Sequence, residues 1–209
     1  MVNISKDDFN FKYWRYYLLL EKRFIDTLDY ATLAIENYRT FSDEYSLLIQ
    51  AIGAELDNVF KTYCHFASSE KKNIGDYANY ILAHYPNITM QKIRIPEFRI
   101  DIQPFLGWDI TRPKQSLQWW TSFDNIKHSR TDNRSEANQE NVLNILGALF
   151  LIERKMLQEI VVGDGTQRIT VSDLPDPKSN LFSLANTGWV TKLLVAALEA
   201  SVCDRTDCD

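Results

Sequence analysis

Glycine and proline are scarce in this chain of 209 residues, which contains seven of the former and six of the latter. Folds with many tight turns need both, so their scarcity argues against a β-sandwich or a β-barrel. Cysteine is also rare. The chain has three, an odd number, and they do not have the spacing of a disulfide framework: Cys64, Cys203 and Cys208. We therefore expect reduced thiols. A chain of this length buries roughly 70% of its unfolded surface, so it needs neither disulfides nor a metal to fold.

A long apolar run and an excess of basic charge are missing as well. The longest apolar run, residues 145–152, is far shorter than the roughly 20 residues of a membrane-spanning helix. The polar start of the chain, with Asp7 and Asp8, does not resemble a targeting segment, and we expect a cytoplasmic protein without a membrane partner. The net charge of −5 does not attract nucleic acid, so any RNA contact must come from a local basic patch.

The sequence shows no pattern for a metal or a cofactor. No two histidines share a metal-ligand spacing, and Cys203 and Cys208 in the polar tail 203–209 have no further thiolate or imidazole nearby. The only glycine pair, in residues 163–165, is typical of a turn rather than of a phosphate-binding loop between a strand and a helix. We therefore predict no metal site and no cofactor.

Apolar periodicity predicts one helical domain over residues 1–209. Residues at three- and four-residue spacing predict a long helix over 8–40 and a second helix that begins at Ser42 or Asp43 and ends near residue 68. A short turn should join these two helices into an antiparallel hairpin. Further helices are expected over residues 76–84, 114–130, 137–160 and 184–202.

Residues 87–107 break this helical pattern. Apolar residues alternate on both sides of Pro96, which predicts a small β-hairpin at about residues 89–104, inserted between helices. The expected helix 137–160 is apolar almost all round from Val142 to Ile152, so it should be the buried centre. The fold class that follows is all-α, a bundle of five or six helices with a small β-hairpin insertion.

The most concentrated polar signal lies in residues 119–134. On a helical wheel, one face should anchor the helix and consists of Trp119, Phe123, Ile126 and Arg130. A second face presents Trp120, Asp124 and His128, each one turn from the next. A carboxylate beside an imidazole favours its charged form, so His128 is a candidate general acid or base.

Cations make this segment the most basic part of an acidic chain, and a phosphate or an RNA backbone could bind there. The candidate catalytic residues are Asn125, Lys127, His128 and Arg130. The candidate binding residues are Trp120, Asp124, Arg134 and Arg112.

A structural interpretation of the same residues stands beside the functional one. Cations at the end of a helix stabilise its dipole, and Asp124 with His128 would then be an ordinary surface pair. The two adjacent tryptophans would belong to the core rather than stack on bases.

Glu55 is a second unusual residue, because it lies within the apolar arc of the helix 43–68. A buried acid is costly unless it is paired. We therefore expect an internal ion pair between Glu55 and Arg130 that locks two helices together, and a catalytic role is the alternative.

The residues Trp119-Trp120-x-x-Phe123-Asp124-Asn125-Ile126-Lys127-His128-Ser129-Arg130 resemble an uncharacterised bacterial group with a Trp-Trp…Asn-x-x-Lys-His-x-Arg signature. Glu55-Leu56-Asp57 and Cys64 fit it too. The group is similar in layout to HEPN domains, helical bundles that occur as ribonuclease toxins, antiphage effectors and non-catalytic partners. The arrangement of the expected elements resembles the family over residues 10–155, and the specific sequence motif lies within residues 119–150.

This resemblance implies a HEPN-like protein that associates with RNA or a nucleotide in defence or stress response. It also implies a homodimer, with a polar pocket of Asn125, Lys127, His128 and Arg130 at the seam.

One departure from the family pattern concerns catalysis. Active HEPN ribonucleases carry an arginine and a histidine with four to six residues between them. If His128 is that histidine, the arginine falls on a residue without charge, namely Thr121, Ser122 or Phe123. Arg130 lies after His128 in the sequence, so it could replace the missing arginine only if the fold or a dimer places it beside the histidine. The alternative function is a structural or protein-interaction bundle without catalytic activity.

Overall fold

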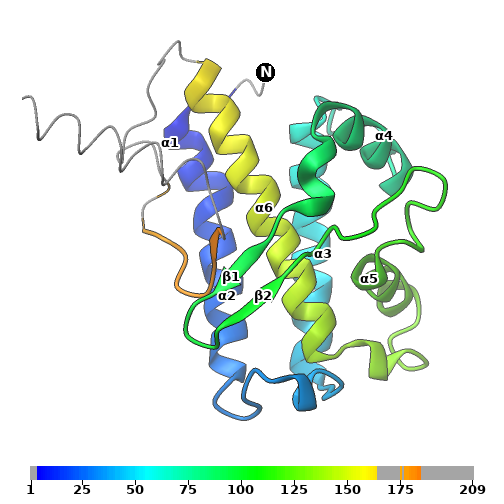
Figure 1. The fold of residues 1–209 in the computed structure, drawn as a ribbon. Coiled ribbons are helices and arrows are strands. Elements are labelled where there is room, and N and C mark those ends of the chain that lie inside the picture. The colour runs from blue at the N-terminus through cyan, green and yellow to red at the C-terminus, as the bar shows by residue number, and fades with distance from the viewer. Residues whose placement is uncertain (1–3, 164–174, 176, 185–209) are drawn as a thin grey trace, which may run out of the picture.

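The computed structural model describes residues 4–163, 175 and 177–184. Over these residues the protein is mainly helical, with five helices and a small three-stranded antiparallel sheet (Figure 1). The predicted fold class, a helical bundle with a small β-hairpin insertion, is therefore confirmed. Within this part of the chain, no helix combines the length and the apolar character that crossing a membrane requires.

The first helix is continuous through three segments: α1 (Lys6–Phe9), a π-helical turn (Asn10–Trp14) and α2 (Arg15–Thr27). The Ser5 side chain caps its start by accepting a hydrogen bond from the backbone N–H of Asp8.

The predicted extension of this helix to residue 40 is wrong. The helix ends at Thr27, and the chain continues through turns and a 3₁₀ turn, Ile35–Asn37. Ile35 continues the apolar spacing of the helix, but it is 76% exposed. The three- to four-residue spacing of apolar side chains therefore extends past the end of the helix, to a position that no neighbouring element covers.

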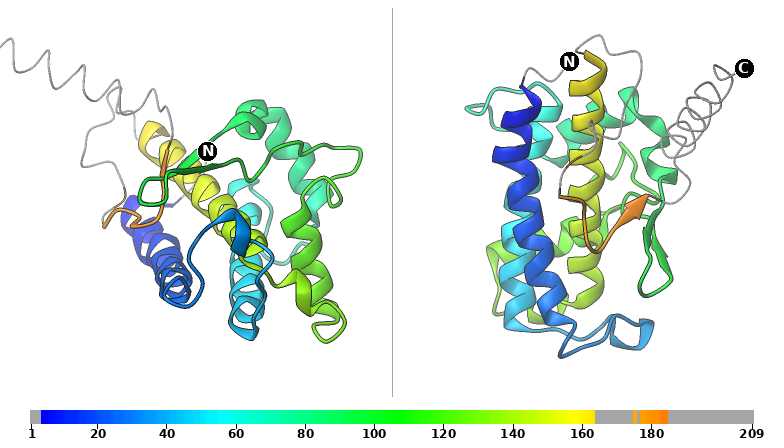
Figure 2. Two further views of the ribbon diagram at one scale, coloured as in Figure 1. Left: turned by 60° about the horizontal axis from the view of Figure 1, so that its bottom comes forward. Right: turned by 90° about the vertical axis from the view of Figure 1, so that its left-hand side faces the viewer.

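The second helix, α3 (Asp43–Tyr63), begins at its predicted cap, because the Ser42 side chain accepts from the backbone N–H of Tyr45. It ends at Tyr63, earlier than predicted, and His65 beyond it has a left-handed φ of 59°. α2 and α3 lie side by side and antiparallel (Figure 2), as predicted, although residues 28–42 join them instead of a short turn.

Three further helices complete the bundle: α4 (Ile74–His84), α5 (Gln118–His128) and α6 (Gln139–Gly163). The helix α6 contacts α1, α2, α3 and α5, and residues 142–152 are buried except for Asn144, which confirms α6 as the centre. Its first turn is capped by Asn138, whose Oδ1 accepts from the N–H of Asn141.

A close approach fixes α5 against α3. Gly53 of α3 faces the ring of Phe123, and a Cβ atom at Gly53 would lie 2.3 Å from that ring. Glycine is therefore required there for α5 to reach its position, which in turn places the polar end of α5.

The β-hairpin consists of β1 (Ile93–Ile95) and β2 (Ile100–Ile102), as predicted, with Ile93 opposite Ile102. A third strand, β3 (Ser183–Leu184), pairs with the other edge of β1. The sequence had suggested the start of a helix at residue 184. The rest of that expected helix and the polar tail 203–209 lie outside the described residues.

A buried carboxylate ties the segment before β3 to the first helix. Glu21 is 1% exposed. Its oxygens accept hydrogen bonds from the Tyr17 hydroxyl at 2.5 Å, the Asn180 N–H at 2.9 Å, the Leu181 N–H at 3.3 Å and the Ser179 hydroxyl. This carboxylate thus brings residues 179–181 against α2, so that β3 can reach β1.

Candidate functional site

The polar segment identified in the sequence lies at the C-terminal end of α5 and in the loop that leads to α6. The helix ends at His128, because Ser129 adopts an extended φ of −151°. Asn133 then donates hydrogen bonds to the carbonyls of Asn125 and Ser129 at 3.2 and 2.7 Å. These bonds add to the backbone bonds that the N–H groups of Ser129 and Asn133 donate to the same two carbonyls, and they hold the loop in place.

Asp124 of α5 interacts with two side chains, one in the loop before the helix and one in its last turn. Its Oδ2 accepts from Nζ of Lys114 at 2.5 Å, and its Oδ1 lies 3.4 Å from Nε2 of His128. The predicted pairing of Asp124 with His128 is therefore confirmed, whereas Lys114 was not anticipated. The side chain of His128 is 72% exposed, so this pair contributes little to stability and the imidazole remains open to solvent.

Arg130 and Arg134 converge on a single carboxylate at the start of α3. An Nη atom of Arg130 lies 3.1 Å from Oδ1 of Asp43, and an Nη atom of Arg134 lies 3.9 Å from the same oxygen. All three side chains are at least 47% exposed. Two cations therefore share one anion at the surface.

The predicted ion pair between Arg130 and Glu55 is wrong. Glu55 lies on α3 twelve residues beyond Asp43, which is about 18 Å along a helix. Arg130 lies beyond the end of α5 and is exposed, so it does not belong to the face that anchors α5.

Glu55 is half-buried, and burial raises its pKa despite a hydrogen bond with Asn58 that lowers it. The more deeply buried acid is Glu153 of α6, which sequence reasoning missed. It is fully buried, and neither carboxyl oxygen has a hydrogen-bond partner among the described residues. Glu153 directly follows the apolar run that identified α6 as the core, and this position was the available signal.

The remaining candidate residues are less free than the sequence suggested. Asn125 donates through Nδ2 to both carboxyl oxygens of Glu136, at 3.1 and 3.2 Å. The ammonium group of Lys127 lies 5.7 Å from the centre of the Phe123 ring. Asn125 is therefore held inside the loop, whereas Lys127 remains exposed at the surface.

Trp120 is 7% exposed and packs against the rings of Phe60 and Phe123. The core interpretation of this residue is confirmed, and its ring is not available to stack on a base. Arg112 is exposed in the loop before α5, and that loop reaches α5 through Lys114.

In the described part of the chain, no group of three or more histidine, cysteine, aspartate or glutamate side chains is placed to hold a metal ion. Cys64 is buried there as a free thiol. Cys203 and Cys208 lie outside the described residues.

Comparison with protein-family profiles, with curated proteins and with solved structures finds no match to this chain.

Proposed function

We propose that this protein is a HEPN-like helical domain that binds RNA or a nucleotide without cleaving it. The binding surface is the end of the bundle where Lys127, His128, Arg130 and Arg134 lie.

The observation that carries the proposal is the convergence of two arginines on one exposed carboxylate, Asp43. Guanidinium groups bind a phosphate with paired, charge-assisted hydrogen bonds. Exposed ion pairs are worth about 0–1 kcal/mol, so a phosphate can displace Asp43 at little cost. Lys127 and His128, both exposed, add donors on the neighbouring turn of α5.

The absence of cleavage follows from the surroundings of His128. A ribonuclease of the HEPN type would need an arginine at position 121, 122 or 123. Ser122 and Phe123 are buried, and Thr121 donates its hydroxyl to the carbonyl of Lys114. Arg130 contacts Asp43 on α3, while His128 contacts Asp124 on α5. The histidine and the arginine thus have separate partners.

The binding claim is tested with a short fluorescein-labelled single-stranded RNA, whose anisotropy is followed as protein is added. The double variant Arg130→Ala/Arg134→Ala should bind more weakly than the wild type. Each phosphate contact to a single strand contributes about 0.7 to the slope of log affinity against log salt, so this slope should fall by about 1.4.

The matched control is Lys71→Ala/Lys92→Ala, which removes the same charge at exposed positions away from α5. Equal affinity for both double variants would contradict the proposed site. Cleavage of the RNA by the wild type that His128→Ala abolishes would contradict a purely binding role.

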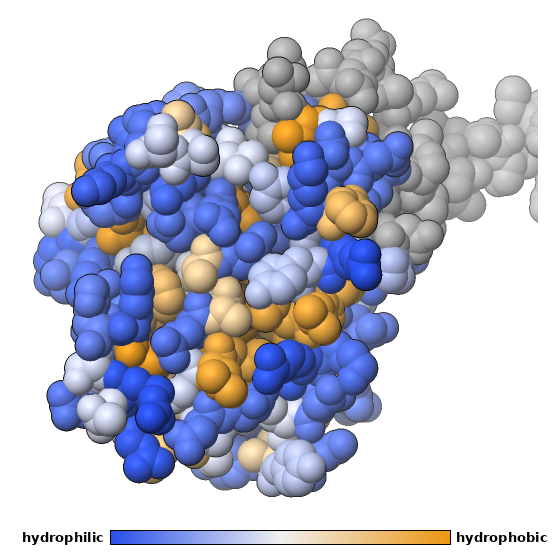
Figure 3. All heavy atoms as spheres, turned by 180° about the vertical axis from the view of Figure 1, so that it is seen from behind, coloured by the Kyte–Doolittle hydropathy of each residue, from blue (hydrophilic) through white to orange (hydrophobic). Residues whose placement is uncertain are grey.

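A second candidate function, a protein-interaction bundle without catalytic activity, is favoured by one observation. Four large apolar side chains between residues 30 and 47 are more than half exposed, namely Tyr30, Ile35, Phe41 and Leu47. Figure 3 shows one face of the protein on which apolar surface gathers toward the middle. If the wild type binds no RNA, this alternative replaces the first.

A further inference from the structure

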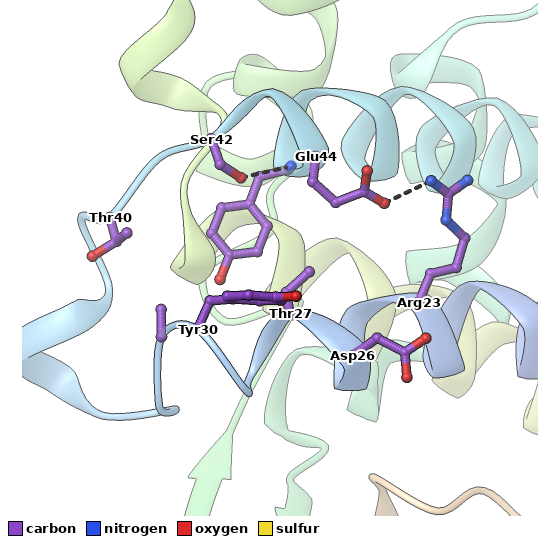
Figure 4. Close-up of a pocket in the computed structure, with 9 residues that line it drawn as sticks. Arg23, Asp26, Thr27, Tyr30, Thr40, Ser42 and Glu44 are labelled. Atoms are coloured by element: carbon purple, nitrogen blue, oxygen red, sulfur yellow. Dashed lines mark hydrogen bonds and ion pairs between the residues drawn. The ribbon is translucent and has the colours of Figure 1, made fainter.

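A cavity of about 490 Å³ lies where α2 ends and α3 begins. Residues of both helices and of the loop between them line it (Figure 4). This volume lies in the range of cavities that take small molecules, about 300–1,000 Å³. None of the candidate residues from the sequence lines it.

The buried side-chain amide of Gln139 forms hydrogen bonds with residues that line the cavity. Gln139 of α6 is fully buried, and its Nε2 donates to the carbonyl of Ala31 at 2.8 Å and to the Tyr45 hydroxyl at 3.4 Å. Ala31 and Tyr45 are both lining residues. The backbone N–H of Gln139 also donates to the carbonyl of Thr40, another lining residue, at 3.0 Å. These bonds fix the backbone at Ala31 and Thr40 and the hydroxyl of Tyr45 on one side of the cavity.

The lining offers flat surfaces together with acceptors. The guanidinium of Arg23 donates to Glu44 at 2.6 Å and bridges the two helices at one side of the cavity, and the ring of Tyr30 lies at another (Figure 4). Planar guanidinium groups and tyrosine rings both stack on heteroaromatic rings.

The charges of the residues that line the cavity indicate which kind of ligand it binds. Among the lining residues two carboxylates outnumber the one cation: Arg23 pairs with Oε1 of Glu44, and Oδ2 of Asp26 pairs with Lys22, which lies outside the lining. Two carboxylates favour a ligand edge that donates hydrogen bonds.

We infer that this cavity binds a planar nitrogen heterocycle with N–H donors, supplied as a free nucleoside or as an unstacked base of a bound RNA strand. The second source rests on the proposed function, and the first does not. Asp43, which holds Arg130 and Arg134, directly precedes Glu44 of the cavity in the first turn of α3. A strand with its phosphate on the arginines can therefore place a neighbouring base in the cavity.

The probe for this inference is guanosine, which has no phosphate and presents adjacent N–H and NH₂ donors that match one carboxylate. Calorimetric titration should show binding to the wild type. Tyr30→Ala and Glu44→Gln should each weaken it about tenfold, because base stacking and charge-assisted bonds are worth factors of this size. Tyr30 is 94% exposed, so its removal should leave the melting temperature unchanged.

Two controls make the result specific. Ile35→Ala removes an exposed apolar side chain outside the cavity and should not change guanosine binding. Caffeine, a planar purine without N–H donors, should bind much more weakly than guanosine. Equal binding of the two compounds, or no guanosine binding by the wild type, would overturn the inference.

The RNA assay separates the two sources. If Tyr30→Ala weakens binding of both guanosine and labelled RNA, the cavity takes a base of the strand. If it weakens only guanosine, the cavity takes a free nucleoside. Failure of guanosine to bind leaves the Arg130→Ala/Arg134→Ala result untouched, so the cavity and the proposed function can fail separately.

Discussion

Glu153 is the one ionisable side chain among the described residues whose buried polar atoms have no hydrogen-bond partner. Burial raises the pKa of its carboxyl well above the ordinary value, and the nearby charge of Glu55 raises it further. Burial also raises the pKa of Tyr17 strongly, with Glu21 and then Glu153 adding to the shift. Both causes favour the neutral form of Glu153 in the folded protein.

A pH dependence of stability follows from Glu153. In the unfolded chain this carboxyl loses its proton near its ordinary value of 4.5, whereas the folded protein retains it. The contribution of Glu153 is fully present below that pH and is lost as the pH rises through the raised pKa. Glu153→Met should remove this decline and raise the free energy of unfolding at pH 8 by about 2 kcal/mol.

Urea unfolding at acidic and alkaline pH measures this effect. Glu36→Gln, which alters an exposed acid, should keep the decline of the wild type. A Glu153→Met variant with the same pH dependence as the wild type would mean that Glu153 is ionised and satisfied.

At the residue scale, the sequence predicts contacts within one helix and misses contacts between distant segments. The Ser42 cap and the Asp124–His128 pair depend on spacings of three and four residues, so they could be predicted. Asp43 and Arg130 lie 87 residues apart, and only the packing of α5 on α3 brings them together.

At the scale of elements, the first helix carries both a π-helical turn and the buried Glu21 that anchors the chain before β3. The strand β3 has only two residues and pairs with β1 about ninety residues earlier, so no local pattern could reveal it. The apolar spacing of residues 8–40 likewise could not show that the helix ends at Thr27.

Glu21→Ala tests this anchor. It removes the acceptor for the N–H groups of Asn180 and Leu181 and for two hydroxyls, so buried donors lose their partner. The free energy of unfolding should fall by about 3 kcal/mol, since each unsatisfied donor costs about 1–3 kcal/mol. Amide exchange at Asn180 and Leu181 should accelerate.

Glu36→Ala serves as the exposed control for the Glu21→Ala experiment. Unchanged stability together with unchanged amide exchange would show that the segment is held by other contacts.

At the scale of the whole molecule, one end of the bundle gathers the features that could bind a ligand. α2 and α5 end there, and α3 and α6 begin there (Figure 1). Backbone hydrogen bonds join the start of α3 to the start of α6, from the N–H of Ser42 to the carbonyl of Ala137. The arginine pair and the cavity therefore lie at the same end of the bundle, which the order of helices along the sequence did not reveal.

In the proposed binding site, Asp43 holds Arg130 and Arg134 where a phosphate would bind. The most direct measurement is the RNA affinity of Asp43→Asn by anisotropy, with Asp7→Asn as the control because Asp7 also lies in the first turn of a helix. Freed from their carboxylate, Arg130 and Arg134 should bind RNA more tightly, and the salt dependence should become steeper. An affinity equal to that of Asp7→Asn, or weaker than the wild type, would contradict the account.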